Sequence, residues 1–145
     1  MPGERRLRLL FVCGGNTCRS AMAAALAKKV VGGAIEAESA GVDPGFSVTR
    51  EAVCVMAHEF ALDISNHEPR ALDAVVPEHF DYIITLDPYV RKRFLEQFPS
   101  LSGKVMSWDV DDPFGQGMQK YSECAYSLSE KLQELGRELR AGREV

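Results

Sequence analysis

The segment Leu7–Ala27 reads LRLLFVCGGNTCRSAMAAALA and contains an apolar run, a glycine-rich turn and an alanine-rich run, in that order. The apolar run Leu7–Val12, interrupted only by Arg8, is typical of a buried parallel strand. The alanine-rich residues after Ser20 have high intrinsic helix propensity. The polar turn Cys13–Ser20 therefore lies at a junction between a strand and a helix.

Strand-like and helix-like segments alternate along the rest of the chain. We predict strands at Leu7–Val12, Ile35–Ala40, Phe80–Leu86 and Lys104–Trp108. We predict helices at Arg19–Val31, at Val48–Leu62, from Pro88 to about Phe98 with Asp87 as N-cap, and at Tyr121–Leu139. This alternation indicates parallel strands joined by right-handed crossovers. The expected fold class is α/β: a three-layer sandwich with a central four-stranded parallel sheet, helices on both faces, and the polar turn between the first strand and the first helix.

The bulk composition limits the classes of function. Hydrophobic residues make up 46% of the chain, which suits a single packed domain over residues 1–145. The 17 Lys and Arg against 21 Asp and Glu, for a net charge of -4, argue against a nucleic-acid partner. We see no signal peptide and no membrane span, so no membrane partner is expected. The four cysteines lack C-x-x-C spacing, and free thiols suit a reducing cytoplasm. We expect a cytoplasmic monomer.

The first turn has the features of an oxyanion site. Gly14 and Gly15 let backbone N–H groups point inward without crowding by a Cβ atom. The start of the following helix adds unpaired N–H groups and the positive end of its dipole. Arg19 adds a planar guanidinium that can bind two oxygens at once. The turn is therefore predicted to be a phosphate-binding loop.

Cys13 lies at the mouth of this loop. The same N–H groups, the dipole and Arg19 would favour its thiolate, which would be a nucleophile aimed at a bound phosphorus. The alternative is an inert buried thiol. The turn has neither the G-K-[ST] ending of a nucleotide-binding loop nor the G-x-G-x-x-G pattern of a dinucleotide fold. The combination C-x5-R-[ST] at a strand-to-helix junction favours the nucleophile.

Two further polar turns, Asp87-Pro88 and Asp109–Pro113, follow the third and fourth predicted strands. Ligands of such sheets bind beyond the carboxyl ends of the strands, so these turns are expected to meet the Cys13–Arg19 loop. Asp112 is then a candidate general acid, although an Asp before a Pro is also a good helix N-cap pair. From the residues alone, Asp87, Asp109 and Asp111 compete for the acid role.

The segment VCGGNTCRSAMA resembles the phosphate-binding loop of the low-molecular-weight protein tyrosine phosphatase family. The resemblance continues along the chain in Ser39-Ala40-Gly41, His67–Arg70, Thr85–Asp87 and Asp112-Pro113. It implies that Cys13 is the nucleophile, Arg19 binds phosphate, and Asp112 is the general acid. It also implies that Asn16 and Ser20 hold the loop's shape and stabilise the thiolate.

The resemblance fixes the remaining site predictions. Phosphate or substrate contacts are expected from Gly14, Gly15, Asn16, Thr17, Cys18, Ser20 and Phe114, with His67 and Asp87 supporting the loop from behind. No metal and no cofactor are expected. The partner would be a phosphorylated protein or peptide. A reversible disulfide between Cys13 and Cys18 would shield the nucleophile from irreversible oxidation, and the alternative is that Cys18 is only a small packed residue.

Several departures leave the substrate open. Gly14 is smaller than the usual residue, Ala21 and Ala24 replace a common proline and glutamate, and Phe114 replaces a common tyrosine. Thr17 stands where tyrosine phosphatases have isoleucine or leucine; Thr17 and the D-P-F-G of Asp112–Gly115 resemble the protein-arginine phosphatases. Phosphotyrosine is the default prediction and phosphoarginine the first alternative.

Two other functions compete with phosphatase activity. Ser107–Pro113 also resembles the acid loop of thioredoxin-linked arsenate reductases. Their chemistry needs two more cysteines, one of them after the third strand, where this chain has Asp87. A relay through Cys54 or Cys124 is the open possibility. A phosphate-binding module that has lost catalysis is the non-enzymatic alternative, but Cys13, Arg19 and an aspartate are all present.

Overall fold

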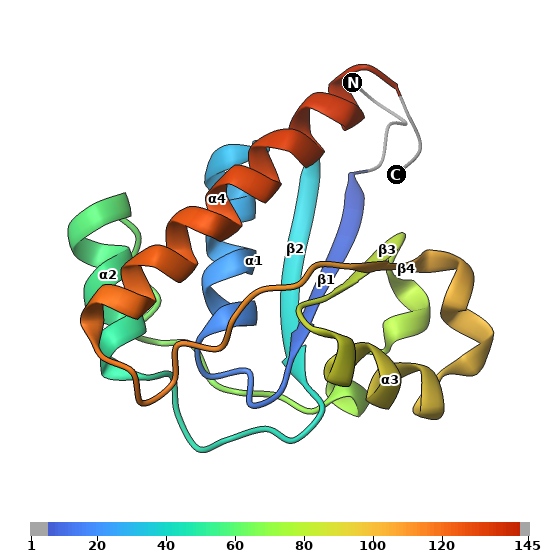
Figure 1. Cartoon of the computed structure of the whole chain (residues 1–145). Coiled ribbons are helices and arrows are strands. Elements are labelled where there is room, and N and C mark those ends of the chain that lie inside the picture. Colours follow the sequence, from blue (N-terminus) through green and yellow to red (C-terminus); the bar gives the residue numbers. More distant parts are fainter. Residues whose placement is uncertain (1–5, 143–145) are drawn as a thin grey trace.

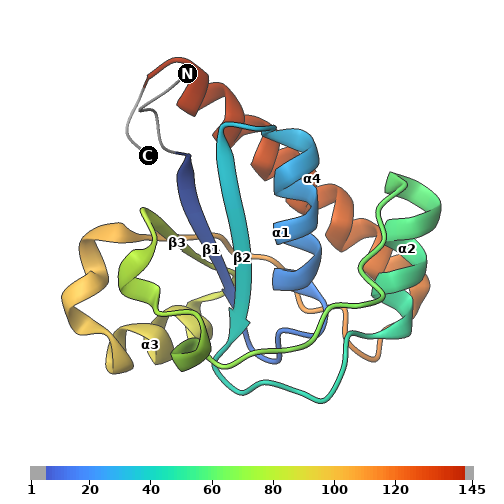
Figure 2. The same cartoon turned by 180° about the vertical axis from the view of Figure 1, so that it is seen from behind.

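The computed structural model describes residues 6–142, within which a four-stranded parallel sheet has the order β2-β1-β3-β4. The strands are β1 Leu7–Cys13, β2 Ile35–Gly41, β3 Tyr82–Thr85 and β4 Val105–Ser107. The main helices are α1 Arg19–Val30, α2 Arg50–Phe60, α3 Pro88–Gln97 and α4 Met118–Arg140. Helices α1, α2 and α4 lie on one side of the sheet and α3 lies on the other (Figures 1 and 2). The predicted three-layer α/β sandwich is confirmed.

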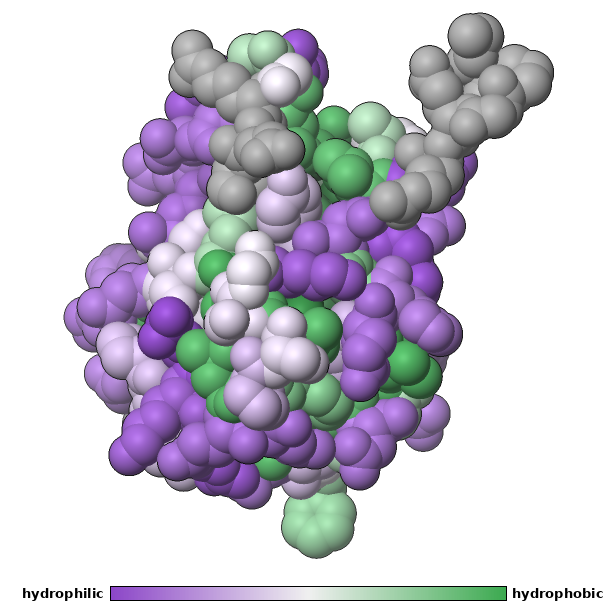
Figure 3. All heavy atoms as spheres, turned by 90° about the vertical axis from the view of Figure 1, so that its right-hand side faces the viewer, coloured by the Kyte–Doolittle hydropathy of each residue, from purple (hydrophilic) through white to green (hydrophobic). Residues whose placement is uncertain are grey.

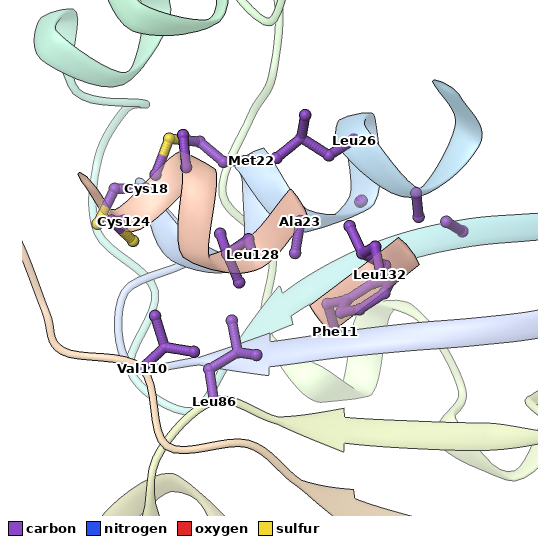
Figure 4. Packing of buried hydrophobic residues seen from close by; sticks show 14 of the residues in the cluster. Phe11, Cys18, Met22, Ala23, Leu26, Leu86, Val110, Cys124, Leu128 and Leu132 are labelled. Carbon is purple, nitrogen blue, oxygen red and sulfur yellow. The ribbon is translucent and has the colours of Figure 1, made fainter. Parts of the chain in front are cut away.

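Strand β1 is central because it is apolar on both faces. Leu9 and Phe11 pack into the core beneath α1 and α4, whereas Leu10 and Val12 pack into the core beneath α3. Side chains alternate across a strand, so the continuous apolar residues 9–12 supply both cores. Figure 4 shows Phe11 facing Ala23 of α1 and Leu128 and Leu132 of α4 in the first of these cores.

Three predicted helix boundaries differ from those in the structure by two residues or more, and side-chain caps mark the start of α2 and of α3. Thr49 accepts a hydrogen bond from Ala52 N, so α2 begins at Arg50 rather than Val48. Asp87 caps α3 as predicted, with its Oδ1 2.7 Å from Val90 N. Helix α2 ends two residues before the predicted Leu62, and α4 begins three residues before the predicted Tyr121. Gly32, with a φ of 94°, follows the end of α1, where glycine adopts the left-handed region without strain.

The third and fourth strands are shorter than predicted. Short 3-10 helices, which the sequence analysis did not anticipate, occupy Leu72–Ala74, Pro77–His79 and Pro99–Lys104. Phe80 and Lys104 end two of these helical segments, so the strands begin after them. The apolar runs therefore overstated the strands, because buried loop residues are as apolar as strand residues.

Among residues 6–142, no helix is both long enough and apolar enough to cross a membrane. Seen from the side of α3 and β4, hydrophobic residues form patches between hydrophilic ones (Figure 3).

The carboxyl ends of the strands all lie at one edge of the sheet, and the loops that follow them converge there (Figures 1 and 2).

Candidate active site

The loop between β1 and α1 is held from outside by the segment that follows β2. The carbonyl oxygens of Cys13, Gly14, Gly15 and Thr17 accept hydrogen bonds of 2.9–3.0 Å from the backbone N–H groups of residues 42, 43, 45 and 49. The loop carbonyls are thereby satisfied by a neighbouring segment. Such an arrangement leaves the loop's own N–H groups for an anion, as in a backbone nest.

Gly41 is required by this contact, and the sequence analysis did not single it out as a site residue. A Cβ atom on Gly41 would lie 2.7 Å from the carbonyl oxygen of Gly14 and 3.0 Å from Asn16 N. Since both neighbours are backbone atoms, the loop itself would have to shift. Gly41 therefore sets how closely β2 can support the loop.

Asn16 organises the loop from its interior. It is fully buried and has a φ of 57°, in the left-handed region that asparagine tolerates better than most residues. Its side chain accepts a 2.9 Å hydrogen bond from Arg70 N and donates a 2.7 Å bond to Ser20 Oγ. Its carbonyl oxygen is 2.8 Å from His67 Nε2. The predicted supporting residue His67 thus lies behind the loop, where Arg70 N joins it as a partner the sequence did not indicate.

The Cys13 sulfur lies at the centre of the loop and is almost wholly buried, with 2% of the residue exposed. Ser20 Oγ is 2.9 Å away, and Ser20 N donates to the sulfur at 3.4 Å. Ser20 Oγ accepts from Asn16 Nδ2, so its own hydrogen can be directed to the sulfur at 2.9 Å or to the Ala40 carbonyl at 3.5 Å. A sulfur that receives hydrogen bonds is better stabilised as a thiolate than as a thiol.

Arg19 links the loop to the ends of β3 and β4. Its Nη1 donates to Asp87 Oδ2 at 2.9 Å and to the Val110 carbonyl at 2.8 Å. Burial opposes the charge on Arg19, but the hydrogen bond to Asp87 and the negative charges of Cys13 and Asp112 outweigh it and raise the pKa of the guanidinium. Asp87, the predicted supporting residue, therefore caps α3 with one oxygen and holds Arg19 with the other.

The Nε of Arg19 is the one buried side-chain nitrogen or oxygen within residues 6–142 that has no hydrogen-bond partner. A buried donor without a partner costs about 1–3 kcal/mol, so such groups need an explanation. The nearest carboxylate, Asp112 Oδ1, is 4.0 Å away, which is too far for a hydrogen bond. An oxyanion bound in the loop would supply the missing acceptor.

Asp112 reaches the loop from the opposite side of the cleft. Two hydrogen bonds of 2.9 Å, from Trp108 N to the Thr85 carbonyl and from Val110 N to the Leu86 carbonyl, hold the segment after β4 against the end of β3. This segment, residues 108–115, contains Asp112 and is called the acid loop below. The Asp112 side chain is 54% exposed, and its Oδ1 accepts a 3.1 Å bond from Phe114 N. It is therefore fixed near the loop but open to solvent.

Cys18 occupies the N-cap position of α1, and its thiol donates to Asp112 Oδ1 at 3.7 Å. Burial and the neighbouring charges of Cys13 and Asp112 raise the pKa of Cys18 to about 12. Cys18 is accordingly a protonated thiol at neutral pH. The two cysteines of one loop thus have different surroundings: Cys13 receives hydrogen bonds, and Cys18 donates one.

The cleft beside the loop has a volume of about 670 Å³. Its walls come from the loop, from residues 45–51 and from the acid loop, and include Cys13, Thr17, Arg19, Asp112 and Phe114. Phe46, which the sequence analysis did not single out, and Phe114 are exposed aromatic residues that both line this cleft. Thr17 lies against the wall at Gly45, where a Cβ atom would come within 2.8 Å of Thr17 Cγ2.

Other candidates lie apart from this cleft. Asp109 and Asp111 line a neighbouring polar cleft of about 470 Å³ between the acid loop and α4, which also contains Cys124 and shares Asp112 with the first cleft. Trp108 packs against the core beside Phe11, with ring centroids 5.9 Å apart. Among residues 6–142, no group of three or more His, Cys, Asp and Glu side chains is arranged to hold a metal ion.

The chain is similar to proteins with three kinds of activity. A family model described as low molecular weight phosphotyrosine protein phosphatase matches residues 8–145. An arsenate reductase 1 of Staphylococcus haemolyticus is 30% identical, covering 87% of this chain and 92% of the relative. A protein-arginine-phosphatase of Bacillus subtilis is 31% identical, covering 93% and 98%. The crystal structure of a low molecular weight protein tyrosine phosphatase from T. tengcongensis superposes with a TM-score of 0.85 at 32% identity, covering 91% and 99%.

Proposed function

The chain belongs to the low molecular weight phosphotyrosine protein phosphatase family, and we propose that it hydrolyses phosphorylated proteins through a cysteinyl-phosphate intermediate on Cys13. One observation carries the proposal: Cys13, Arg19 and Asp112 meet in a single cleft although Asp112 is far from the other two in sequence. The unpaired buried Nε of Arg19 in that cleft supports a bound oxyanion.

In the first step, the Cys13 thiolate attacks phosphorus in line with the leaving group. The bond between phosphorus and the leaving atom breaks, and Asp112 gives that atom a proton. Loop N–H groups and Arg19 hold the equatorial oxygens, on which charge is spread in the transition state. The exposure of Asp112 on the solvent side of the cleft suits a leaving group that departs outward.

In the second step, water replaces the leaving group. Asp112, now a carboxylate, takes a proton from the water as its oxygen attacks phosphorus. The sulfur–phosphorus bond breaks, and inorganic phosphate and the Cys13 thiolate are released. The hydrogen bonds from Ser20 stabilise the departing thiolate. These steps need no metal ion, so purified protein in chelator should hydrolyse a small aryl phosphate.

Asp112→Asn is expected to lower kcat/KM more for substrates whose leaving group needs a proton than for substrates whose leaving group departs as an anion. With phosphotyrosine the loss should be on the order of 10²–10³-fold, within the range of positioned general acids. With a dinitrophenyl phosphate, whose anion leaves without a proton, the loss should be under about tenfold. Steady-state kinetics on a series of aryl phosphates of graded leaving-group pKa would measure the difference as a change in slope.

Asp111→Asn is the matched control, since it removes the same charge from the same loop but lines the other cleft. It should keep the wild-type slope. Equal losses for good and poor leaving groups in Asp112→Asn would show that Asp112 is not the acid.

For the substrate, we propose phosphotyrosine. The exposed aromatic residues Phe46 and Phe114, which both line the cleft, suit a phenol ring carried into it. Phosphoarginine is the second candidate, because Thr17 places a small side chain with a hydroxyl beside the loop. Arsenate reduction ranks lower, since residues 87–98 contain no cysteine.

Thr17→Ile is expected to separate the two phosphatase substrates. The wild type should have the higher kcat/KM on a phosphotyrosine peptide than on a phosphoarginine peptide of matched sequence. The added bulk beside Gly45 should cost roughly tenfold or more on phosphoarginine, the usual cost of one misplaced methylene group, and little on phosphotyrosine. Phosphate release from both peptides measures the ratio.

Thr17→Val controls for shape, because it removes the hydroxyl and keeps the branched volume. A loss on phosphoarginine in Thr17→Val as well would assign the effect to the hydroxyl rather than to size. A wild-type preference for phosphoarginine would replace phosphotyrosine as the proposed substrate. An unchanged preference in both variants would mean that Thr17 only fills space.

A further inference from the structure

The contact between Cys18 and Asp112 has no part in phosphate hydrolysis as described above. The Cys18 thiol donates to Asp112 Oδ1 at 3.7 Å, while Cys18 and Cys13 line the same cleft. The same carboxylate oxygen accepts from Phe114 N, so it is held in place. A buried thiol, a carboxylate and the proposed nucleophile are therefore grouped at one site.

Cys18 is poorly suited to act as a nucleophile without help. Its raised pKa of about 12 leaves very little thiolate at neutral pH, and the thiolate is the form that attacks sulfur. A disulfide between Cys13 and Cys18 can form quickly only if a base takes the Cys18 proton during the attack. Asp112 Oδ1 is already the acceptor of that proton in the structure.

We infer that Asp112 is the general base that lets Cys18 close a disulfide onto an oxidised Cys13. The inference deepens the proposed function, because it rests on Cys13 being the reactive thiolate. Hydrogen peroxide is the oxidant. The Cys13 thiolate attacks one peroxide oxygen, the O–O bond breaks, Cys13 becomes a sulfenic acid, and the departing hydroxide takes a proton from solvent to become water.

The closing step balances around Asp112. The Cys18 proton passes to Asp112 Oδ1 as the Cys18 sulfur attacks the Cys13 sulfur. The S–O bond of the sulfenic acid breaks, and the departing hydroxide takes the proton from Asp112 to become water. The carboxylate is restored, and the disulfide holds two fewer electrons than the two thiols. Asp112 thus protonates a leaving oxygen here as it does in ester hydrolysis.

Cys124 is the competing partner for Cys18. It is buried in the same hydrophobic core, and Figure 4 shows both residues at the same end of that core. Burial raises the pKa of Cys124 to about 12. Cys124 nevertheless lines the cleft behind the acid loop rather than the one that contains Cys13. We therefore expect Cys13, not Cys124, to be joined to Cys18.

The test measures disulfide closure rather than hydrolysis. Wild type, Asp112→Asn, Asp112→Glu and Asp111→Asn are treated with hydrogen peroxide at one pH, quenched with an alkylating reagent at intervals, and mapped by peptide mass spectrometry. Asp112→Asn should slow the Cys13–Cys18 bond by roughly a hundredfold, the lower end of general-base effects, and divert Cys13 to sulfinic and sulfonic acid. Asp112→Glu should restore part of the rate, and Asp111→Asn should match wild type.

If Asp112 acted only through its negative charge, Asp112→Asn would change the rate of disulfide closure in the opposite direction. The Asp112 carboxylate disfavours the Cys18 thiolate, so without a base role its removal would speed closure. Faster or equal closure in Asp112→Asn would overturn the inference, as would a Cys18–Cys124 disulfide as the main product or no sulfenic acid on Cys13. Aryl phosphate hydrolysis by the untreated wild type tests the proposed function separately. An active enzyme whose closure ignores Asp112 overturns only the inference.

Discussion

Cys13→Ser is expected to lower kcat on a small aryl phosphate by on the order of 10⁴-fold or more, because the covalent route is lost. A serine hydroxyl at this position would have no adjacent general base: its neighbour Ser20 Oγ, 2.9 Å from the sulfur, is a neutral hydroxyl and a weak base. The phosphate-binding groups remain, so the variant should still bind inorganic phosphate. Phosphate release and phosphate-binding calorimetry measure the two effects separately.

Cys54→Ser is the matched control for Cys13→Ser. Cys54 is a partly exposed thiol on α2 and does not line the cleft. Its loss should leave kcat within about twofold of wild type, as for most surface substitutions. Turnover by Cys13→Ser near the wild-type rate would remove Cys13 as the nucleophile and with it the covalent route. Loss of phosphate binding would instead indicate a damaged loop.

The sequence predicted the fold well because periodicity and caps report on the backbone directly. The apolar run at β1, interrupted only by Arg8, indicated a strand buried on both faces, and Asp87-Pro88 marked the start of α3, both of which are confirmed. Both predicted ends of α2 were wrong by two residues, and β3 was wrong by two residues at its start and by one at its end. There, hydrophobicity continued past the regular structure into Val48 and Phe80, which pack against the core from loops.

The candidate site was predictable only where its residues lie in one segment or match a motif. The loop Cys13–Ser20 is local, so its chemistry could be read from spacing. Gly41 and Arg70 lie in segments that resemble the family, but how they support the loop could not be read, because a missing Cβ and a backbone N–H leave no chemical signal in a sequence. Phe46 was missed for a similar reason: one exposed aromatic residue in a loop has no periodicity, and only its position on the cleft wall gives it meaning.

Arg19→Lys is expected to lower kcat/KM by about 10²–10³-fold, the cost of losing a transition-state donor, although the charge is kept. Nη1 of the guanidinium donates to Asp87 and to the Val110 carbonyl, while Nε has no partner and would donate to the oxyanion proposed above. An ammonium has one nitrogen and cannot do both. Bound to Asp87, it leaves phosphate without its side-chain donor; bound to phosphate, it releases the acid loop. Kinetics and inhibition by inorganic phosphate would report the loss.

Arg93→Lys is the control for the loss of a guanidinium that binds a carboxylate through two nitrogens. Arg93 binds Asp43 through both terminal nitrogens, at 2.9 and 3.2 Å, on the exposed side of the segment that supports the loop. Exposed ion pairs contribute about 0–1 kcal/mol, so this exchange should change kcat/KM little. If Arg19→Lys also stayed within tenfold of wild type, charge alone would suffice at the site. The unpaired Nε of Arg19 would then have no functional reason, and its burial would be only a cost to stability.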